Sequence, residues 1–449
     1  MSYYHIVLLI SGILFLLLGV LTCHFLFFSV VGIFAKKRFP HTDKQYKYGI
    51  IIPARNEEAV VGGLIESVQK NNYPQDKLHI FVIAHNCTDR TAEIARKMGA
   101  TVYEYNNPAE CTMGYAFRHL FACIERDYGT QNYDGFFLFN ADNILDRNYF
   151  SKMNDAFAYY DKKYVITSFR NSKNFGTNLL SGLYGMYFAI GCRMESRGRT
   201  VMGCSTRVQG TGYVINSEIV RDGWPYVSLT EDWEFSADQI LQANKIRYCD
   251  DAVFYDEQPT TFGIMWRQRV RWSRGHLLVF YARIKDLIAS LFRRRQPHKG
   301  SLYDITINIL PATLLWLAVF LLQMAALLLV PVVDPSMTLR DVFWGNGNFF
   351  TSRGILFFSL RLGLLSYVLT VLGAILVFAV EHRRIKGVPL WRKCLIALAW
   401  PLFLAIQLPM DVQALFSRNL GWKPIPHKDR TSFRHVNEET DASAETENA

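Results

Sequence analysis

Long apolar runs near the two ends of the chain enclose a central region in which short apolar and polar stretches alternate. Residues 6–35 contain no acidic side chain, lysine or arginine. This run exceeds the roughly 20 apolar residues that a helix needs to cross a bilayer. A cleaved signal peptide is the alternative, but no positive residue precedes the run and the basic cluster 36–38 follows it. We therefore expect residues 1–38 to form a transmembrane helix whose carboxyl end faces the cytoplasm.

Residues 45–260 have the pattern of an α/β domain. Their alternation of strand-like and helical spacing predicts a largely parallel sheet with helices on both faces. Ligands of such sheets bind at the carboxyl ends of the strands, where polar clusters follow at 55–57, 86–89 and 140–142. The expected strands are 48–52, 78–84, 101–105 and 136–139, and the expected helices are 57–71 and 89–98.

The next part of the chain mixes arginines with large apolar side chains. Residues 261–300 contain Trp266, Val270 and the apolar run 277–280 beside many basic residues. This composition predicts amphipathic helices that lie in the membrane interface. A solvated charged helix is the alternative, although it would not need so many large apolar residues.

Further apolar runs predict a membrane region over residues 301–416. The runs 305–333 and 355–380 are long enough to span a bilayer. The shorter run 395–410 contains Pro401 and fits a span, a dip into the membrane or an interfacial segment.

The topology of this region follows from its charges, except at the end. Residues 381–386 are basic and fit a cytoplasmic loop, so 334–353 would face outside. A spanning third run would put the polar tail 417–449 outside, whereas its basic stretch 418–430 favours the cytoplasm. The side of the tail therefore stays open, and its acidic end is expected to be disordered.

Charge and cysteine usage narrow the setting. The formal net charge is +10, and lysines and arginines crowd beside the apolar runs. This placement favours membrane lipids over nucleic acid as partners. The eight cysteines form no Cys-x-x-Cys pair, so we expect reduced thiols rather than a disulfide framework or a zinc site. The sequence thus predicts a multi-pass protein of the cell membrane with a cytoplasmic catalytic domain.

The first chemical cluster is Asn140-Ala141-Asp142, directly after an apolar strand. A carboxylate in this place can hold Mg²⁺ or Mn²⁺ through oxygen, and the metal would bridge two phosphates of a nucleotide. A plain turn or helix cap is the alternative.

The second cluster is Thr230-Glu231-Asp232. Asp232 can act as a general base that takes the proton from an attacking hydroxyl. The alternative is structural, with Thr230 capping the following helix.

The third cluster runs from Gln268 to Trp272. Helical spacing puts Gln268, Arg271 and Trp272 on one face, with Arg269 beside it. Arginines suit a pyrophosphate because they present a fork of donors and stay charged. The alternative is an amphipathic helix with a lipid-facing indole and arginines at the head groups.

In this order the clusters resemble the inverting family 2 glycosyltransferases. The likeness is to the membrane-integrated synthases of cellulose, chitin, hyaluronan and poly-N-acetylglucosamine. It runs from about residue 46 to Trp272 and extends weakly over the membrane part. It also includes Pro-Ala-x-Asn-Glu-Glu at 53–58, Thr88-Asp89, and the stretch 422–427 near the carboxy-terminus.

The resemblance implies a GT-A fold, an α/β nucleotide-diphospho-sugar transferase domain, followed by helical membrane segments. It assigns the nucleotide-sugar to Ala54, Glu57, Asp89, Asp142, Arg269 and Arg271. It makes Asp142 the ligand of Mg²⁺ or Mn²⁺ and Asp232 the catalytic base. It assigns the acceptor to Gln268, Trp272 and Glu231, with the stretch 210–212 lining the acceptor side or forming a plain turn.

The sequence departs from the family pattern at three positions. Asn140 replaces the first Asp of Asp-x-Asp, which removes one charge from the metal or sugar contact. His85 stands where an Asp is usual, and it is either a base contact or a satisfied histidine beside the cleft. Met113 stands where a Lys is frequent.

The expected activity is the transfer of a sugar from a nucleotide-sugar donor to a growing polysaccharide. The expected donor is a UDP-hexose or UDP-N-acetylhexosamine. Addition of a single sugar to a lipid-linked acceptor is one alternative. A catalytically inactive membrane scaffold that retains the fold is another. A transporter is disfavoured, because neither intramembrane carboxylates nor repeat pairs mark a substrate path.

Overall fold

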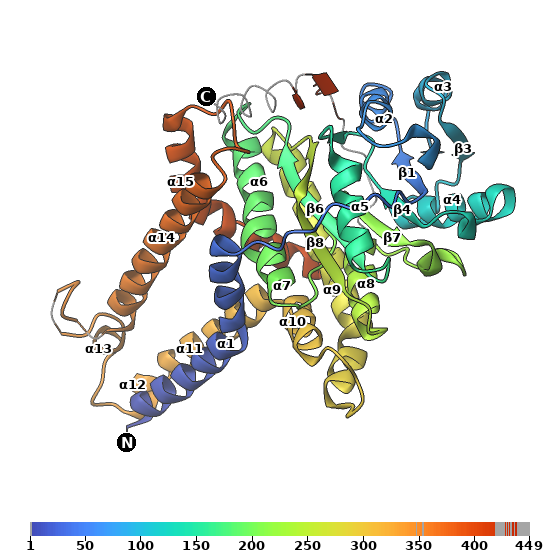
Figure 1. The fold of residues 1–449 in the computed structure, drawn as a ribbon. Helices are drawn as coiled ribbons and strands as arrows, with labels where there is room; N and C mark the ends of the chain where they lie inside the picture. The colour runs from blue at the N-terminus through green and yellow to red at the C-terminus, as the bar shows by residue number, and fades with distance from the viewer. Residues whose placement is uncertain are drawn as a thin grey trace.

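The computed structural model shows an α/β domain from which long apolar helices project (Figure 1). It describes residues 2–346, 348–352, 354–417, 427, 429, 431, 433, 434, 436 and 437. Most of the predicted polar tail 417–449, including 422–426 of the carboxy-terminal motif, lies outside these residues.

The domain is built on an eight-stranded sheet with the order β3-β2-β1-β4-β7-β6-β8-β5. Its first half is parallel, as predicted: β1 pairs with β2 and with β4, and β2 pairs with β3. Its second half is mixed, because β7 runs antiparallel to β4 and β6, and β5 runs antiparallel to β8. The strands are β1 (Tyr48–Ala54), β2 (Leu78–His85), β3 (Thr101–Tyr105), β4 (Gly135–Leu138), β5 (Ile144–Leu145), β6 (Val165–Ser172), β7 (Tyr213–Asn216) and β8 (Ile246–Asp256).

The prediction of a largely parallel sheet is therefore wrong for the second half, and the path after β6 explains why. One continuous helical run, α6 (Leu179–Ile190), the π-helix η3 (Gly191–Ser196) and α7 (Arg197–Val201), follows β6. The chain then runs along the sheet from Thr206, bonded to Ile246 at the start of β8, to Gln209, bonded to Arg170 near the end of β6. Because this extended segment has already crossed the sheet, β7 must run back in the opposite direction.

Helices cover both faces of the sheet, in agreement with the sequence pattern. Alternate residues of β4 show the two sides: Phe137 packs with α2 (Val61–Gln69) and α5 (Tyr149–Tyr159), whereas Phe136 packs with α4 (Met113–Tyr128) and α8 (Glu231–Leu241). The predicted helix 57–71 begins only at residue 61, because the preceding residues form the turn after β1. The remaining short elements are α3 (Thr91–Lys97), η1 (Gln75–Lys77), η2 (Thr130–Asn132) and η4 (Ser217–Val220).

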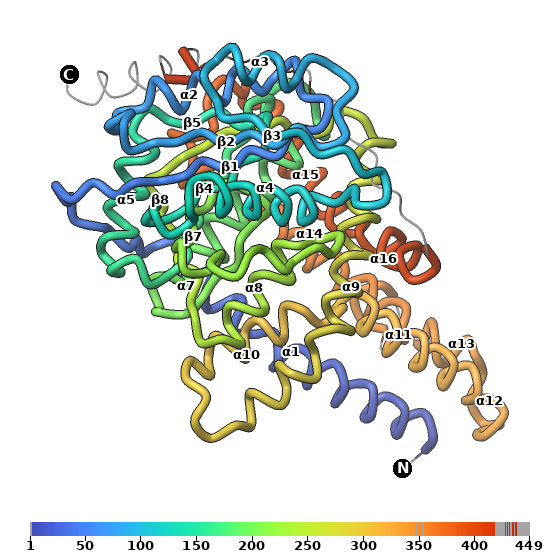
Figure 2. The backbone as a smooth tube through the Cα atoms, turned by 90° about the vertical axis from the view of Figure 1, so that its right-hand side faces the viewer, coloured from blue at the N-terminus to red at the C-terminus, as the bar shows by residue number. Residues whose placement is uncertain are grey.

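In the described part of the chain, four helical segments are long and apolar enough to cross a membrane: Tyr3–Phe34, Ala312–Val333, Ile355–Val380 and Leu390–Phe416. They correspond to α1 (Tyr3–Phe34), α11 (Ala312–Leu328) with α12 (Val330–Val333), α14 (Ile355–Val380), and α15 (Leu390–Ala405) with α16 (Gln407–Phe416). The short α13 (Leu339–Phe343) lies between α12 and α14. Figures 1 and 2 show α1 and α11 running side by side away from the domain.

The predicted run 305–333 is not one helix. Its first residues belong to α10 (Lys299–Ile309), which packs against α9 (Phe262–Phe292) and α8. The break comes at Pro311, which has no backbone N–H and opposes helix continuation in the residue before it.

Ion pairs and carbonyl contacts fasten α1 to the domain. The Arg199 guanidinium and the His24 ring both contact the buried carboxylate of Asp304, at 2.7 and 3.0 Å. Arg193 of the π-helix donates to the carbonyl of Ile33, and Arg197 donates to that of Ala35. The end of α1 is therefore held against the same helical run that leads into the segment before β7.

Contacts on both sides of α15–α16 bear on residues 395–410, which the sequence left open between a span, a dip and an interfacial segment. The chain after α14 is held to the domain by Arg384, which contacts the Asp250 carboxylate at 3.0 Å. After α16, His427 contacts Glu57 at 2.9 Å, and the side chain of Asn437 accepts from the backbone of Arg147. The chain thus contacts the domain both before α15 and after α16, while the segment itself is long and apolar enough to span.

Candidate active site

The loops after β1 and β2 hold the residues that the sequence predicted to meet the nucleotide. Asn56 has a left-handed backbone, with φ of 59°, and its side-chain oxygen accepts from the Thr88 N–H at 2.7 Å. Asp89 accepts from the Glu58 N–H at 3.1 Å and from the backbone of Thr91. These bonds join the two strand ends, so Asp89 already has a structural role in the loop predicted to meet the nucleotide.

Beside these loops the protein gathers several carboxylates around one histidine. His427 Nδ1 lies 2.9 Å from Glu57 Oε1, and Asp142 is 3% exposed and accepts from the Glu257 N–H at 2.8 Å. Burial opposes charge on His427, but Asp142 and Glu57 outweigh it and raise its pKa to about 9. Burial raises the pKa of Glu57. A cation of the protein's own therefore lies among these acids at neutral pH.

The residues around Asp142 fit a divalent ion that is completed by substrate. Within the described residues no three His, Cys, Asp or Glu side chains form a ready-made metal cluster. Asn140 Oδ1, however, is buried and has no hydrogen-bond partner among the residues that the structure describes. Mg²⁺ is commonly held by one or two carboxylates together with substrate phosphates, so Asp142 with the Asn140 oxygen suits this mode.

A short loop connects this acidic side to the predicted base. The Asn140 N–H donates to Thr211 Oγ1 at 2.9 Å. Gly210 has φ of 79°, and a Cβ built on it would stand 3.8 Å from Asp232 Oδ2. Glycine suits this conformation because a side chain would be strained there. The stretch 210–212 thus lies between Asn140 and Asp232, and Gly210 lines the same cavity as Asp232.

The Thr-Glu-Asp cluster begins α8 but does not act as the predicted cap. Thr230 occupies the N-cap position, yet its hydroxyl makes no cap bond and finds no hydrogen-bond partner within the described part of the chain. Gly275 of α9 allows the close approach there, because a Cβ on it would meet Thr230 Cγ2 at 2.4 Å. Asp232 Oδ1 accepts from the Trp233 N–H at 2.9 Å, which fixes its orientation.

Electrostatics distinguish the two adjacent acids. Glu231 is 7% exposed, and burial together with the Asp232 charge raises its pKa to about 8. Burial also raises the pKa of Asp232, while Arg207, the Trp233 N–H and Arg271 oppose that rise. Burial therefore pushes both acids toward the protonated form, and the Arg207 and Arg271 charges with the Trp233 N–H favour the ionised form of Asp232.

The predicted face of α9 turns toward these acids. Tyr184 donates its hydroxyl to Gln268 Oε1 at 3.0 Å, and the Trp272 ring packs edge-on against Tyr184. Arg271 donates to the carbonyl of Leu229 at 3.3 Å. Burial lowers the pKa of Arg271, while Glu231 and Asp232 raise it.

Arg269 has different partners from those that the sequence suggested. Its Nε donates to Gln407 at 2.9 Å, its Nη1 donates to the carbonyl of Phe403, and its guanidinium stacks on the Phe403 ring at 4.3 Å. This arginine therefore binds the bend between α15 and α16 and joins α9 to the membrane-side helices.

One cavity of about 910 Å³ unites the base side of the site. It brings together most of the base-side residues that the sequence predicted, but not Ala54, Glu57, Asp89 or Asp142. It continues between α11, α14 and α15, where Thr313, Thr370 and Trp400 line it. The predicted residues in its wall are Glu231, Asp232, Gln268, Arg269, Arg271 and Trp272, joined by Asn140.

The structure also resolves the unusual positions and adds residues that the motifs missed. His85 is 4% exposed, its Nε2 lies 2.7 Å from the Glu110 carbonyl and its pKa is lowered by burial, so it is a satisfied histidine. Met113 lines the cavity at the start of α4. The missed cavity residues include Arg170, Arg207, Gln209 and His276. None of these belongs to a recognisable motif, so spacing gave no signal for them.

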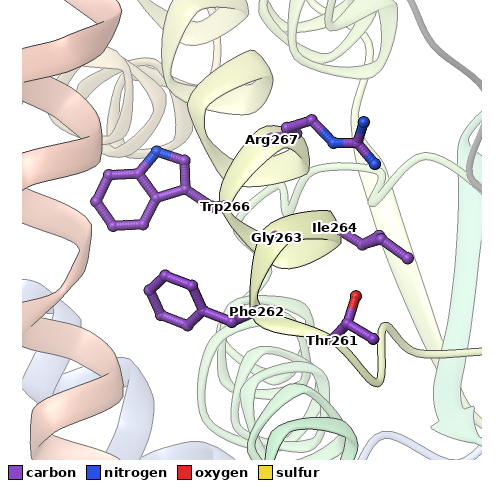
Figure 3. Close-up of a pocket in the computed structure, with 6 residues that line it drawn as sticks. All are labelled: Thr261, Phe262, Gly263, Ile264, Trp266 and Arg267. Carbon is purple, nitrogen blue, oxygen red and sulfur yellow. The ribbon is translucent and has the colours of Figure 1, made fainter.

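A second pocket, of about 650 Å³, lies at the start of α9. Figure 3 shows Phe262 and Trp266 on one side of the first turns and Ile264 and Arg267 on the other. Phe262 is 55% exposed, and Trp266 Nε1 donates to Gln413 of α16 at 2.7 Å. This mixture of exposed aromatic and basic side chains agrees with the expected amphipathic character of 261–300.

The sequence profile of the family described as "Glycosyltransferase like family 2" matches residues 45–275. This stretch covers the whole sheet and reaches the predicted Gln-x-x-Arg-Trp motif. The chain belongs to glycosyltransferase family 2. The match confirms the resemblance stated from the motifs. The α/β domain of this glycosyltransferase is the catalytic domain that the motifs led us to expect.

Two similar bacterial proteins support the same family assignment. A "Probable glycosyltransferase YdaM" of Bacillus subtilis is 26% identical over 266 residues, which are 58% of this chain and 60% of the relative. A poly-beta-1,6-N-acetyl-D-glucosamine synthase of Staphylococcus aureus is 24% identical over 293 residues, 64% of this chain and 67% of the relative. The chain thus matches about three fifths of the Bacillus protein's length.

The fold has a solved counterpart. The mannosyltransferase PcManGT from Pyrobaculum calidifontis, solved with GDP-Man and Mn²⁺, superposes with a TM-score of 0.57 at 13% identity. The superposition covers 93% of this glycosyltransferase and 100% of that chain. The predicted GT-A fold with helices beyond it is confirmed.

Proposed function

We propose that this glycosyltransferase is a membrane-bound inverting enzyme that moves a sugar from a nucleotide-sugar to a growing polysaccharide. The observation that carries the proposal is the single cavity lined by Asp232, Arg271 and Trp272 that continues between the membrane-side helices. The Staphylococcus relative is named for a polymer of N-acetyl-D-glucosamine, which supports an N-acetylhexosamine as the sugar moved. We propose a UDP-N-acetylhexosamine or UDP-hexose as the donor.

The reaction follows from the two ends of the site. Asp232 takes the proton from the acceptor hydroxyl, and that oxygen attacks the anomeric carbon from the face opposite the leaving diphosphate. The configuration inverts because there is one displacement. Arg271 stabilises charge that develops on the leaving group, while Glu57 and Asp89 position the nucleoside and Ala54 lines its site. Mg²⁺ or Mn²⁺ held by Asp142 and the Asn140 oxygen would supply Lewis-acid stabilisation of the diphosphate.

The membrane arrangement supports a cytoplasmic site. The basic residues 36–38 follow α1, and Lys36 contacts Asp250 of the domain at 3.6 Å. Positive residues beside a membrane helix mark the cytoplasmic side, where nucleotide-sugars are made. We therefore place the domain in the cytoplasm, with α1, α11 and α14 crossing the membrane and α15–α16 returning to the domain's side.

A lipid-linked acceptor is a second candidate, and the apolar part of the cavity wall supports it. Where the cavity passes α14 and α15, Leu369, Ala374 and Leu404 line it. Such apolar side chains suit an acyl or prenyl chain better than a hydrated sugar polymer. Trp272 and Trp400 in the same wall suit sugar rings. We therefore propose a polysaccharide as the acceptor ahead of a lipid-linked sugar.

The test is a donor and product survey with the purified full-length protein in lipid nanodiscs. UDP or GDP release is measured from a panel of nucleotide-sugars, with and without Mn²⁺, and the product is sized. Release of UDP with long polymer supports the first proposal, and a single sugar on extracted lipid supports the second. If the protein binds UDP but releases no nucleotide from any donor, the result favours the alternative of an inactive scaffold.

A further inference from the structure

An arginine outside every motif lies beside the proposed base. Arg207 belongs to the extended segment that crosses the sheet before β7, and it lines the same cavity as Asp232. Its guanidinium stacks on the ring of Trp233, the residue next to the base, at 4.5 Å. A stacked guanidinium keeps its charge and has a fixed orientation, so the position of this charge relative to Asp232 is defined.

A glutamate holds the other side of this arginine. Glu195 Oε2 lies 3.5 Å from Arg207 Nη2 and 3.9 Å from Arg199 Nη1. Glu195 belongs to the π-helix Gly191–Ser196 and lines the cavity with Arg207. Single π-helical turns inside α-helices are frequent at functional sites, and this one presents its acid to the arginine beside the base.

The other charges near Asp232 do not replace Arg207. Glu231 and Glu234 of its own helix add negative charge, and Arg271 of α9 is shared with Glu231. His276 of α9 packs edge-on against Trp233 at 4.7 Å, and burial lowers its pKa, so it is neutral at pH 7. Asp411 of α16 lines the cavity as a further anion.

We propose that Arg207 is a positioning residue that keeps Asp232 ionised for proton abstraction, and that Glu195 limits the strength of this effect. The inference rests on the proposed function, since it presumes that Asp232 is the base. Arg207 acts through Asp232 and touches no reacting atom. Its opposing partner, Glu195, draws the guanidinium away from the base and so lowers the attraction between them.

The two partners should shift the pH dependence of turnover in opposite directions. Loss of a cation beside Asp232 raises the pKa of the base, so Arg207→Gln should move the acid limb of the kcat profile up by about one pH unit. Loss of the anion should do the reverse, so Glu195→Gln should move it down by roughly half a unit. Arg207→Lys keeps the charge but loses the planar stack on Trp233, so its limb should lie between those of the wild type and Arg207→Gln.

The experiment measures UDP release from the accepted donor between pH 5 and 9, using full-length protein in nanodiscs. Arg126→Gln, a remote exposed change of the same charge, is the matched control and should leave the profile unchanged. Equal loss of rate at all pH values in Arg207→Gln and an unchanged limb in Glu195→Gln would overturn the proposal. If Arg207→Gln does not fold, Glu195→Gln alone decides. An acid limb of its kcat profile that stays at the wild-type pH or moves to higher pH overturns the proposal. A wild type without any UDP release would instead reject the proposed function.

Discussion

The two halves of the site are organised differently. On the nucleotide side, carboxylates are engaged by backbone N–H groups and by His427, which contacts Glu57 across a separation of 370 residues. On the base side, Glu231, Asp232 and Arg271 lie on α8 and α9, two helices that pack directly together. In the proposed reaction the base is thus preorganised by the fold, whereas we propose that substrate and a metal ion complete the nucleotide side, to which the tail residue His427 also belongs.

After Asp232 itself, Arg271 is the residue whose substitution should affect the base side most. Arg271→Ala leaves Glu231 and Asp232 without their α9 cation, and we expect kcat to fall about a hundredfold. Arg271→Lys should recover only part of the rate, because it loses the donor fork. Steady-state UDP release measures both. Wild-type kcat in Arg271→Ala would show that the base side is not preorganised as described.

Removal of the metal tests the opposite half. Treatment with a chelator should lower turnover by roughly a hundredfold, and added Mn²⁺ should restore it. Asp142→Asn should weaken Mn²⁺-dependent UDP binding, measured by calorimetry, and leave the fold intact. Full UDP affinity and turnover in the chelated wild type would remove the metal from the nucleotide side.

Arg269 distinguishes a link to the membrane helices from a contact with diphosphate. Arg269→Ala breaks the bonds to Gln407 and Phe403, and we expect about a tenfold loss of kcat with little change in UDP affinity. Gln407→Ala is the matched variant and should show part of the same loss. A large drop in UDP affinity in Arg269→Ala, together with wild-type behaviour of Gln407→Ala, would show that Arg269 binds the diphosphate.

His427 gives the smallest expected effect. Its pKa is raised to about 9, so its charge contributes stability fully below pH 6.5, and this contribution is lost as the pH rises through about 9. His427→Ala should lower Tm by about 2 °C at pH 6 and much less at pH 10. Thermal unfolding in nanodiscs at both pH values measures this. An equal difference at both would contradict the charged contact with Glu57.

Sequence patterns predicted the parallel half of the sheet well, because its strands are short apolar runs between helices of regular period. They failed after β6, since the segment that contains Arg207 alternates too weakly to show that it crosses the sheet. Pro311 was visible in the sequence, and its missing N–H accounts for the end of α10. The extent of an apolar run alone could not reveal this break.

Motifs found the base and the α9 face because both lie within short stretches of sequence. They could not find His427, Arg207 or Glu195 as members of the site, since these reach it only through the fold. The spacing of Arg269 suggested a diphosphate ligand, and it could not show that the Arg269 Nε also donates to Gln407, the first residue of α16.

The central claim is that Asp232 is the base of a glycosyl transfer in the cavity shared with Arg271. Asp232→Asn keeps the shape and the contact with the Trp233 N–H but removes the proton acceptor. The account predicts that this variant loses UDP release by a factor of at least about a thousand while it binds UDP and Mn²⁺ like the wild type. Turnover within a few-fold of the wild type, at unchanged donor affinity, would contradict it.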